Sequence, residues 1–120
     1  MATTDTSVTL HPYFKVNPGK LDEFKQIVDQ FVAKTRSEPK CIHYAFSFNG
    51  DEAFCREGYD DAAGLLAHLD NVGAIFQEAL KLAQVTRFEV HAPASEIEKL
   101  RAPMAALNTQ FWVLGDGFRR

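Results

Sequence analysis

The stretch IHYAFSFNGDEAFCREGYDDAAGLLAHL, residues 42–69, holds a hairpin and the start of a helix, and it decides the fold. The pair Asn49-Gly50 is the strongest short hairpin signal, and runs rich in aromatic residues lie on both sides of it. We therefore predict two paired strands over roughly 41–48 and 52–59.

The second half of this stretch changes from alternating to helical spacing. Asp60 or Asp61 can cap a short helix, because an aspartate side chain accepts hydrogen bonds from the first backbone amides of a helix. The segment VGAIFQEALKLA, residues 72–83, forms a second helical piece. The apolar residues that these two pieces present are Leu65, Leu66, Leu69, Val72, Ile75, Phe76, Ala79 and Leu80.

Strands and a helix are also predicted on either side of the hairpin and its helix. Residues 8–16 alternate between apolar and polar side chains, as is typical of a strand with two unlike faces, and residues 84–92 alternate again. Pro12 removes a ladder donor and belongs at a sheet edge or a bulge. A stripe of apolar residues at helical spacing begins at Leu21, and Pro39 ends this helix.

The predicted order is strand, helix, hairpin, helix, strand. This β-α-β-β-α-β order is typical of an α+β, ferredoxin-like sheet with helices on one face. We predict a single domain over 1–120, with a flexible tail at 1–7 and an extension at 93–120. The extension is expected to hold a helix that starts with a capping box at 95–98 and a fifth strand at 109–115. The apolar edge of that helix would consist of Ile97, Leu100, Met104 and Leu107.

The composition fits a folded domain and excludes several classes of partner. The 120 residues are 46% hydrophobic, which is enough for one core, and the net charge of −3 comes without a block of like charges. Neither a nucleic-acid-binding face nor a membrane anchor is indicated, and no apolar run is long enough to span a bilayer. The polar first residues do not resemble a signal peptide, so we expect a cytoplasmic protein.

The two cysteines are expected to stay free. A two-residue hairpin loop would place Cys55 opposite Tyr44, and a four-residue loop would place it opposite Phe46. Cys41 does not face Cys55 in either register, and two free thiols suit a reducing compartment. The sequence contains no CxxC pair and no HExxH, so we expect no bound metal.

A sheet with helices on one face leaves its other face to water, a partner or a ligand. One face of the predicted hairpin is too aromatic to remain in water. We therefore expect a homodimer in which a second copy covers the exposed sheet face, with a small-molecule pocket between the sheet and the helices. The aromatic face consists of Ile42, Tyr44, Phe46, Phe48, Ala53, Cys55, Glu57 and Tyr59.

Three segments resemble the antibiotic biosynthesis monooxygenase family. EGYDDAAGLLAHL (57–69) is similar to the family pattern E-x-[WY]-x-[DS] followed by L-x-A-H-L. VNPGKLDEFKQ (16–26) resembles its Pro-Gly turn, and EPKCIHYAF (38–46) its entry into the second strand, with Lys40 where Gly is usual. The resemblance covers about the first 92 residues and implies a dimeric α+β barrel. It also implies monooxygenase chemistry without a cofactor, although the family includes isomerases and haem-degrading enzymes.

The resemblance places the functional positions of the family at Glu57, Tyr59 and His68, and we predict Glu57 and His68 as the catalytic residues. A carboxyl group among aromatic side chains has a raised pKa and is suited to proton transfer near neutral pH. Glu57 could instead pair with Arg56 or Arg87 across the sheet. His68 lies on the flank of the buried arc of its helix, where an imidazole can act as acid or base or stabilise the helix end.

Further aromatic and basic residues are candidates for substrate binding. Tyr44 and Phe46 share the strand face of Glu57, and Tyr59 is better suited to an aromatic wall than to proton donation. The polar candidates on the outer strands could line a cavity or form the solvated sides of those strands. The full predicted substrate-binding set is Tyr59, Tyr44, Phe46, Tyr13, His11, Arg87 and His91.

Three functions remain open from the sequence. The family resemblance implies oxygenation of a small phenol or quinol, whose own anion reduces oxygen. The alternatives are a small-molecule-binding or structural dimer without turnover, and an isomerase that uses the same acid–base pair. A cavity that touches both Glu57 and His68 favours the two enzymes, whereas a solid interior favours the structural dimer.

Overall fold

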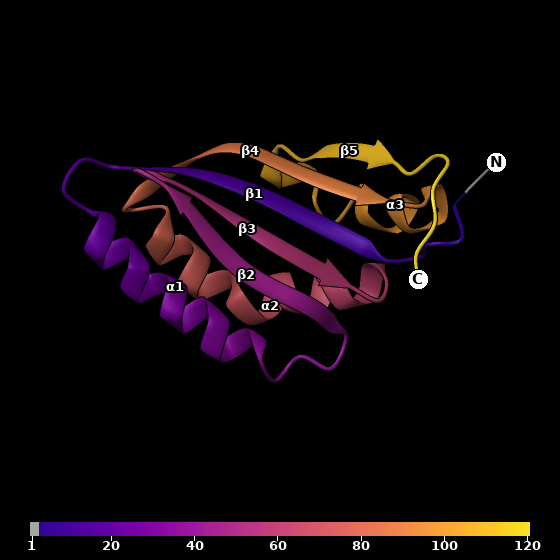
Figure 1. Cartoon of the computed structure of the whole chain (residues 1–120), viewed down its shortest axis with the longest axis horizontal. Coiled ribbons are helices and arrows are strands. Elements are labelled where there is room, and N and C mark those ends of the chain that lie inside the picture. The colour runs from indigo at the N-terminus through magenta and orange to yellow at the C-terminus, as the bar shows by residue number, and fades with distance from the viewer. Residues whose placement is uncertain (1–2) are drawn as a thin grey trace.

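The computed structural model describes residues 3–120 and contains a mixed five-stranded sheet with helices packed on it (Figure 1). The strands are β1 (Val8–Val16), β2 (Cys41–Asn49), β3 (Glu52–Tyr59), β4 (Ala83–Ala92) and β5 (Gln110–Val113). The helices are α1 (Leu21–Thr35), α2 (Ala62–Ala79) and α3 (Ala94–Leu100), followed by the 3-10 turn η1 (Ala105–Leu107).

The strand order is β2-β3-β1-β4-β5, and the β4–β5 pair is parallel while the other pairs are antiparallel. The first four strands have the ferredoxin-like order, so the predicted α+β fold class is confirmed. In the view of Figure 1 the strands lie in front of α2 and α3, and β5 extends the sheet beyond β4.

Helix α2 is continuous, so the prediction of two shorter pieces is wrong. It is capped by Asp61, whose Oδ1 accepts a hydrogen bond from the backbone N–H of Gly64 at 2.9 Å. The polar residues between the two apolar runs do not interrupt it. Asp70 is exposed, and the Asn71 side chain donates to the backbone oxygen of Lys34 on α1 at 3.1 Å.

Pro12 lies in β1, which is a central strand, so of the two expected positions, a sheet edge or a bulge, the edge is excluded. The sheet accommodates the missing donor by an interruption of one ladder. Pairing of β1 with β3 covers Val8 to Leu10 and resumes at Tyr13. On its other side, the register between β1 and β4 shifts after Tyr13, as in a bulge.

The β2–β3 hairpin combines features of both predicted loops. Phe46 lies opposite Cys55, as expected for the longer loop, yet the turn itself has only the two residues Gly50 and Asp51 between paired strand ends. Gly50 has a φ of 61°, a conformation that residues with a Cβ rarely adopt. Cys41 and Cys55 are free thiols.

The aromatic face of the hairpin packs against the helices of the same chain. Tyr44 and Phe46 join a cluster with Phe24 and Phe31 of α1. The helices therefore cover the middle of this face without a second copy, while Ile42 and Phe48 remain 39% and 38% exposed. Alternation along a strand separates its two faces, but it does not reveal which of them the helices cover.

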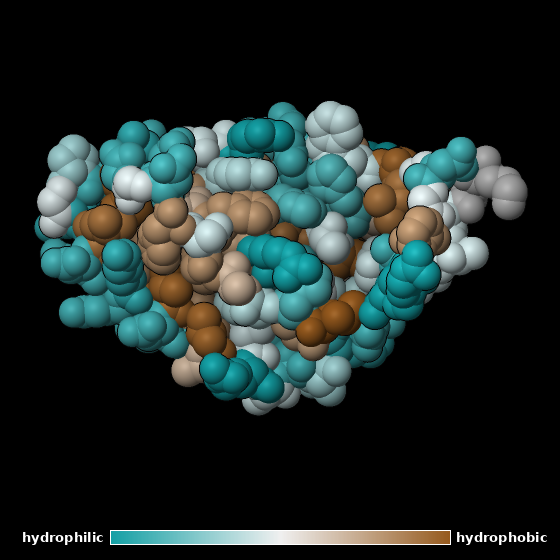
Figure 2. Space-filling view, viewed as in Figure 1, coloured by the Kyte–Doolittle hydropathy of each residue, from teal (hydrophilic) through white to brown (hydrophobic). Residues whose placement is uncertain are grey.

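The opposite sheet face carries polar side chains together with rings such as Tyr13, His91 and Trp112, and no helix of residues 3–120 covers it (Figure 1). Here the His43 ring lies directly over Gly58, where an added Cβ would come within 2.5 Å of the imidazole Nε2. In the same view, apolar groups form separate patches between hydrophilic ones (Figure 2).

The C-terminal extension contributes to the core. Ile97, Leu100 and Met104 are fully buried against β4 and α2 residues. The predicted capping box is wrong, because α3 begins at Ala94 and the capping position is Pro93. No helix within residues 3–120 has the length and apolar character needed to cross a membrane.

The predicted N-terminal tail is described from Thr3 onward, and its first two residues lie outside the described part of the chain. The backbone N–H of Ser7 donates to Asp5 at 2.9 Å, so a local turn leads into β1.

Candidate functional site

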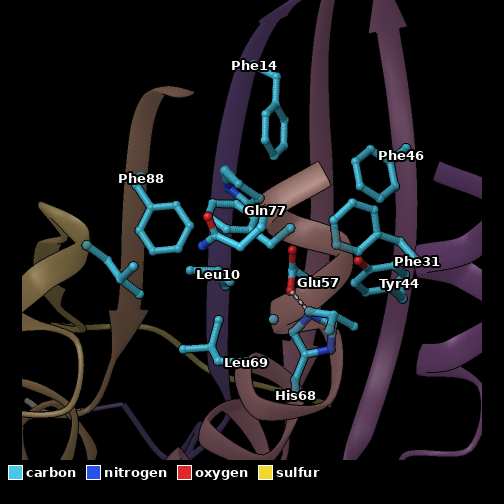
Figure 3. A pocket seen from close by; sticks show the side chains of 15 residues that line it. Leu10, Phe14, Phe31, Tyr44, Phe46, Glu57, His68, Leu69, Gln77 and Phe88 are labelled. Atoms are coloured by element: carbon cyan, nitrogen blue, oxygen red, sulfur yellow. Dashed lines mark ion pairs between the residues drawn. The ribbon is translucent and has the colours of Figure 1, made fainter. Parts of the chain in front are cut away.

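A cavity of about 150 Å³ lies between the sheet and α2 (Figure 3). Its wall is mostly aromatic and aliphatic, and among its lining residues only Glu57 and His68 are acid–base groups that ionise near neutral pH. Figure 3 shows these two side chains next to each other on one wall. The other lining residues are Leu10, Pro12, Phe14, Phe31, Tyr44, Phe46, Leu69, Val72, Gly73, Phe76, Gln77, Phe88 and Leu107.

Glu57 receives two contacts at the same carboxyl oxygen. The Tyr59 hydroxyl donates to Glu57 Oε1 at 2.6 Å, and His68 Nε2 lies 3.3 Å from that oxygen. The strand places the first pair together, because residues two apart on β3 point to the same face. Helix α2 brings the imidazole to this face from the adjacent layer.

The other imidazole nitrogen contacts Glu38, which lies in the loop between α1 and β2. His68 Nδ1 lies 2.9 Å from Glu38 Oε2 and 3.1 Å from Oε1. The Asn71 side chain donates to Glu38 Oε2 at 2.8 Å and to the Lys34 backbone oxygen at 3.1 Å. Glu38, His68 and Glu57 therefore form a continuous chain of contacts that ends at the cavity.

Burial changes the acid–base properties of both cavity groups. Burial raises the pKa of Glu57 to about 8, and hydrogen bonds from Tyr59 and Cys55 act in the opposite direction. Burial lowers the pKa of His68, and the nearby Glu38 carboxylate opposes this effect. Near neutral pH, the pair is therefore a protonated carboxyl group beside a neutral imidazole.

These contacts favour one tautomer of the neutral imidazole. A carboxylate can only accept, so the Nδ1 proton of His68 is donated to Glu38. Nε2 is then left without a proton, and it lies 3.3 Å from Glu57 Oε1. A modest shortening of this contact would bring the two groups within hydrogen-bond distance, where a proton could pass between them.

Two tyrosine rings surround the imidazole. The centroids of the Tyr44 and Tyr59 rings each lie 5.2 Å from that of His68. Burial raises the pKa of both hydroxyl groups far above neutrality, so they remain protonated. Their role in the geometry is to exclude water and, for Tyr59, to donate to Glu57.

The predicted site residues separate into two groups on opposite faces of the sheet. Glu57, His68, Tyr44 and Phe46 line the cavity, and Tyr59 supports Glu57 without lining it. The remaining four predicted residues, His11, Tyr13, Arg87 and His91, lie together on the open sheet face.

Ring contacts connect these four residues and Trp112, with Phe54 between His11 and Tyr13. The centroids of the His11 and His91 rings are 4.6 Å apart, and His91 stacks on Trp112 at 5.7 Å. The Arg87 guanidinium lies 4.9 Å from the centroid of the Tyr13 ring. The thickness of the sheet separates this group from the cavity.

Several parts of the site were not predicted from the sequence, among them Glu38, Gln77 and Leu107. Glu38 lies in a loop, where periodicity does not predict side-chain direction, although it precedes the family-like entry into β2. Gln77 and Leu107 line the cavity from α2 and η1. The spacing of Leu107 with Ile97, Leu100 and Met104 indicated an apolar edge, but not which cavity it would border.

Among residues 3–120, no group of three or more His, Cys, Asp or Glu side chains is arranged to hold a metal ion.

Comparison with protein families identifies the chain. The family described as antibiotic biosynthesis monooxygenase matches residues 7–85. The chain belongs to this family. No curated protein matches the sequence.

Solved structures extend the comparison over nearly the whole chain. MupZ from Pseudomonas fluorescens is 43% identical with a TM-score of 0.92, and the match covers 96% of this chain and 95% of MupZ. Rv0793 from Mycobacterium tuberculosis is 22% identical with a TM-score of 0.65, covering 73% of this chain and 95% of that protein. A conserved protein from Methanosarcina mazei is 21% identical with a TM-score of 0.65, covering 72% and 89%. The latter two similarities support the fold alone.

Proposed function

We propose that this protein is a cofactor-independent monooxygenase that acts on a small phenolic or quinol-type molecule. The supporting observation is a mostly apolar cavity with one acid–base pair, Glu57 and His68, in its wall. An apolar cavity of about 150 Å³ in another protein takes up benzene, so a cavity of this size is suited to one aromatic ring. Membership of the antibiotic biosynthesis monooxygenase family supports the reaction type.

The proposed reaction takes its electrons from the substrate and its oxidant from dissolved oxygen. A base removes the hydroxyl proton of the phenol, and the electron-rich anion reduces O₂ to form a carbon–oxygen bond at a ring carbon. The resulting peroxide loses water and leaves a quinone. One oxygen atom enters the product, the other leaves as water, and the substrate supplies all four electrons that reduce O₂.

The acid–base pair is suited to holding the proton between these steps. A substrate hydroxyl at the cavity wall can transfer its proton to the Glu57 carboxyl group while the carboxyl proton moves to His68 Nε2, which lies 3.3 Å from Glu57 Oε1. The proton can return when the peroxide loses water. Tyr44 and Phe46 would hold the substrate ring, and the Gln77 amide would bind a second oxygen at the exposed end of the cavity.

We also propose that the protein is a homodimer in which second copies cover each other's open sheet faces. Members of this family are typically dimers. The open face carries Trp112 with 51% of its surface exposed. The free thiols Cys41 and Cys55 support the cytoplasmic location that we propose.

The proposed reaction is tested by oxygen uptake with a panel of hydroquinones and single-ring phenols. We expect Glu57→Gln to reduce the rate by roughly 10²- to 10⁴-fold, the usual contribution of a positioned acid–base group. The matched control is Glu52→Gln, which changes an exposed carboxylate on the same strand and should retain the full rate.

The outcomes separate the three candidate functions. Oxygen uptake that requires Glu57 and releases a quinone supports the proposal. If the protein converts a small carbonyl compound equally fast with and without oxygen, the isomerase would replace the monooxygenase as the function. Ring binding without any turnover would leave the non-catalytic small-molecule-binding dimer.

A further inference from the structure

We infer that Glu38 is a positioning residue that holds His68 in the tautomer needed for proton exchange with Glu57 and stabilises the imidazolium form. This inference rests on the proposed acid–base function of the cavity. Glu38 does not line the cavity and acts only through His68.

The first argument is that the Glu38–His68 contact is buried and short. His68 Nδ1 lies 2.9 Å from Glu38 Oε2, and the two side chains are only 3% and 9% exposed, respectively. Exposed ion pairs contribute little because water screens them, whereas a buried charge next to an imidazole is screened much less.

The second argument is that Glu38 is itself fixed in position. The Asn71 amide donates to Glu38 Oε2 at 2.8 Å and to the Lys34 backbone oxygen at 3.1 Å. Asn71 lies on α2, about one turn after His68. Its side-chain amide therefore ties the Glu38 carboxylate to both α1 and α2. Such a clamp restricts the carboxylate to the direction of the Nδ1–H bond.

The third argument concerns charge during proton transfer. When His68 accepts a proton from Glu57, a positive charge forms in a buried place. The titratable groups that face the imidazole are Glu38, Glu57, Tyr44 and Tyr59, and neither tyrosine ionises near neutral pH. Glu57 supplies the proton, so Glu38 is the carboxylate that offsets the new charge from the far side of the ring.

Glu38 can carry this charge because it also borders the solvent. It lines a surface groove of about 490 Å³ on the outer side of β2, together with Thr35 and His43. Water in this groove can hydrate the carboxylate, while Glu57 is enclosed on the other side of the imidazole.

The first test does not require a substrate. NMR of labelled histidine in the wild-type protein should show His68 with its proton on Nδ1 near neutral pH. In Glu38→Gln, the titration of His68 should move to lower pH, because the carboxylate that favours the charged imidazole is gone. The glutamine amide introduced at position 38 can also donate to Nδ1, so we expect part of the His68 population to carry its proton on Nε2. The control Glu78→Gln, which changes an exposed carboxylate on α2, should leave both signals unchanged.

The second test uses turnover. We expect Glu38→Gln to lower kcat roughly 10- to 100-fold, a part of the usual acid–base contribution, with little change in KM. Glu38→Asp should recover part of the rate because it keeps the charge. If Glu38→Gln does not fold, Asn71→Ala serves instead, since it frees the carboxylate without removing it.

An unchanged His68 tautomer and titration in Glu38→Gln would overturn the inference. So would an equal loss of activity in Glu38→Gln and Glu38→Asp, because a charge-based role predicts partial rescue. If no hydroquinone is oxidised but the NMR changes occur, the proposed reaction fails while the positioning role of Glu38 stands.

Discussion

Glu57 is a carboxyl group with 3% of its surface exposed, in a cavity whose wall is mostly aromatic and aliphatic. The sheet and α2 withhold the water that would hydrate its ionised form, and the remaining polar contacts come from Tyr59, His68 and Cys55. The protonated form therefore persists to a pH at which an exposed glutamate is fully ionised. The free energy of unfolding must then depend on pH through the ionisation of Glu57.

The stability of the fold should decrease between pH 4.5 and about 8, the ordinary and the raised pKa of Glu57. In this window the folded chain keeps a proton that the unfolded chain releases, so rising pH favours unfolding. Glu57→Gln cannot ionise and should gain stability relative to wild type across the window, by at most about 1.4 kcal/mol per pH unit. Urea denaturation of both proteins at several pH values measures this difference. Parallel curves for the two proteins would contradict it.

The hydrogen bond from the Tyr59 hydroxyl should lower the pKa of Glu57, whereas burial raises it. This 2.6 Å hydrogen bond favours the ionised carboxylate, so Tyr59→Phe should raise the pKa of Glu57 further. The loss of one buried hydrogen bond should cost about 0.5–1.5 kcal/mol of stability. Carbon NMR of labelled glutamate measures the titration. A midpoint that moves to lower pH would show that the hydroxyl does not act on the carboxylate.

Residue identity alone predicted part of this arrangement. Glu57 and Tyr59 share a strand face by simple alternation, and Leu65 and Leu69 place His68 on the flank of its helix. Glu38 follows neither rule, because the loop before β2 has no repeating geometry. The buried partner of an imidazole is a long-range contact that local spacing does not contain.

The C-terminal extension adds two unequal contributions to the domain. The family match ends at residue 85, and α3, η1 and β5 all lie beyond it. Leu100 on α3 is fully buried in the core, whereas Leu107 on η1 is 37% exposed and borders the cavity. The same extension thus stabilises the fold with one leucine and shapes the site with another.

Leu100→Ala and Leu107→Ala should therefore have different effects. The first removes a core side chain and should cost about 2–5 kcal/mol of stability, measured by urea denaturation. The second should cost less than about 1 kcal/mol and shift binding toward larger ring compounds, measured by calorimetry with substituted hydroquinones. Equal stability losses, with ligand preference unchanged, would show that Leu107 is only a core residue.

Hydrophobic periodicity predicted most elements because each strand and helix has one buried face. It failed where two elements meet. The spacing of residues 60–83 does not show that one helix continues through the polar residues 70 and 71. The helix accommodates Asn71 by a contact with α1, and such a long-range contact is not visible in local spacing. Likewise, Pro12 lies in a central strand because the ladder to β3 is interrupted there, a property of the pair of strands and not of either sequence.

At the scale of the whole molecule, the helices cover one sheet face and leave the other open. The open face presents a row of rings, with Trp112 stacked on His91 at an interplanar angle of 8°. Trp112 is 51% exposed, so its change has little effect on the core of one chain. It is the residue that best separates folding from association.

The proposed dimer should dissociate more readily when Trp112 is replaced by a charged residue. Trp112→Glu would place a carboxylate in the interface and should weaken association at least tenfold, which is about 1.4 kcal/mol. Trp112→Phe keeps an apolar ring and serves as the control. Sedimentation equilibrium measures both variants, and circular dichroism confirms that each chain is folded. A wild-type protein that sediments as a monomer at every concentration would exclude the dimer.

The unbroken course of α2 has a practical consequence for anyone who wishes to redesign the substrate range. His68 and Gln77 are nine positions apart, which corresponds to roughly 13.5 Å along a helix axis. Mutant libraries can therefore vary the C-terminal third of this helix to reshape the cavity opening, while the part around His68 is left intact. Because both residues lie on one continuous helix, a proline introduced between them would kink the helix and displace the catalytic imidazole and the cavity opening relative to each other.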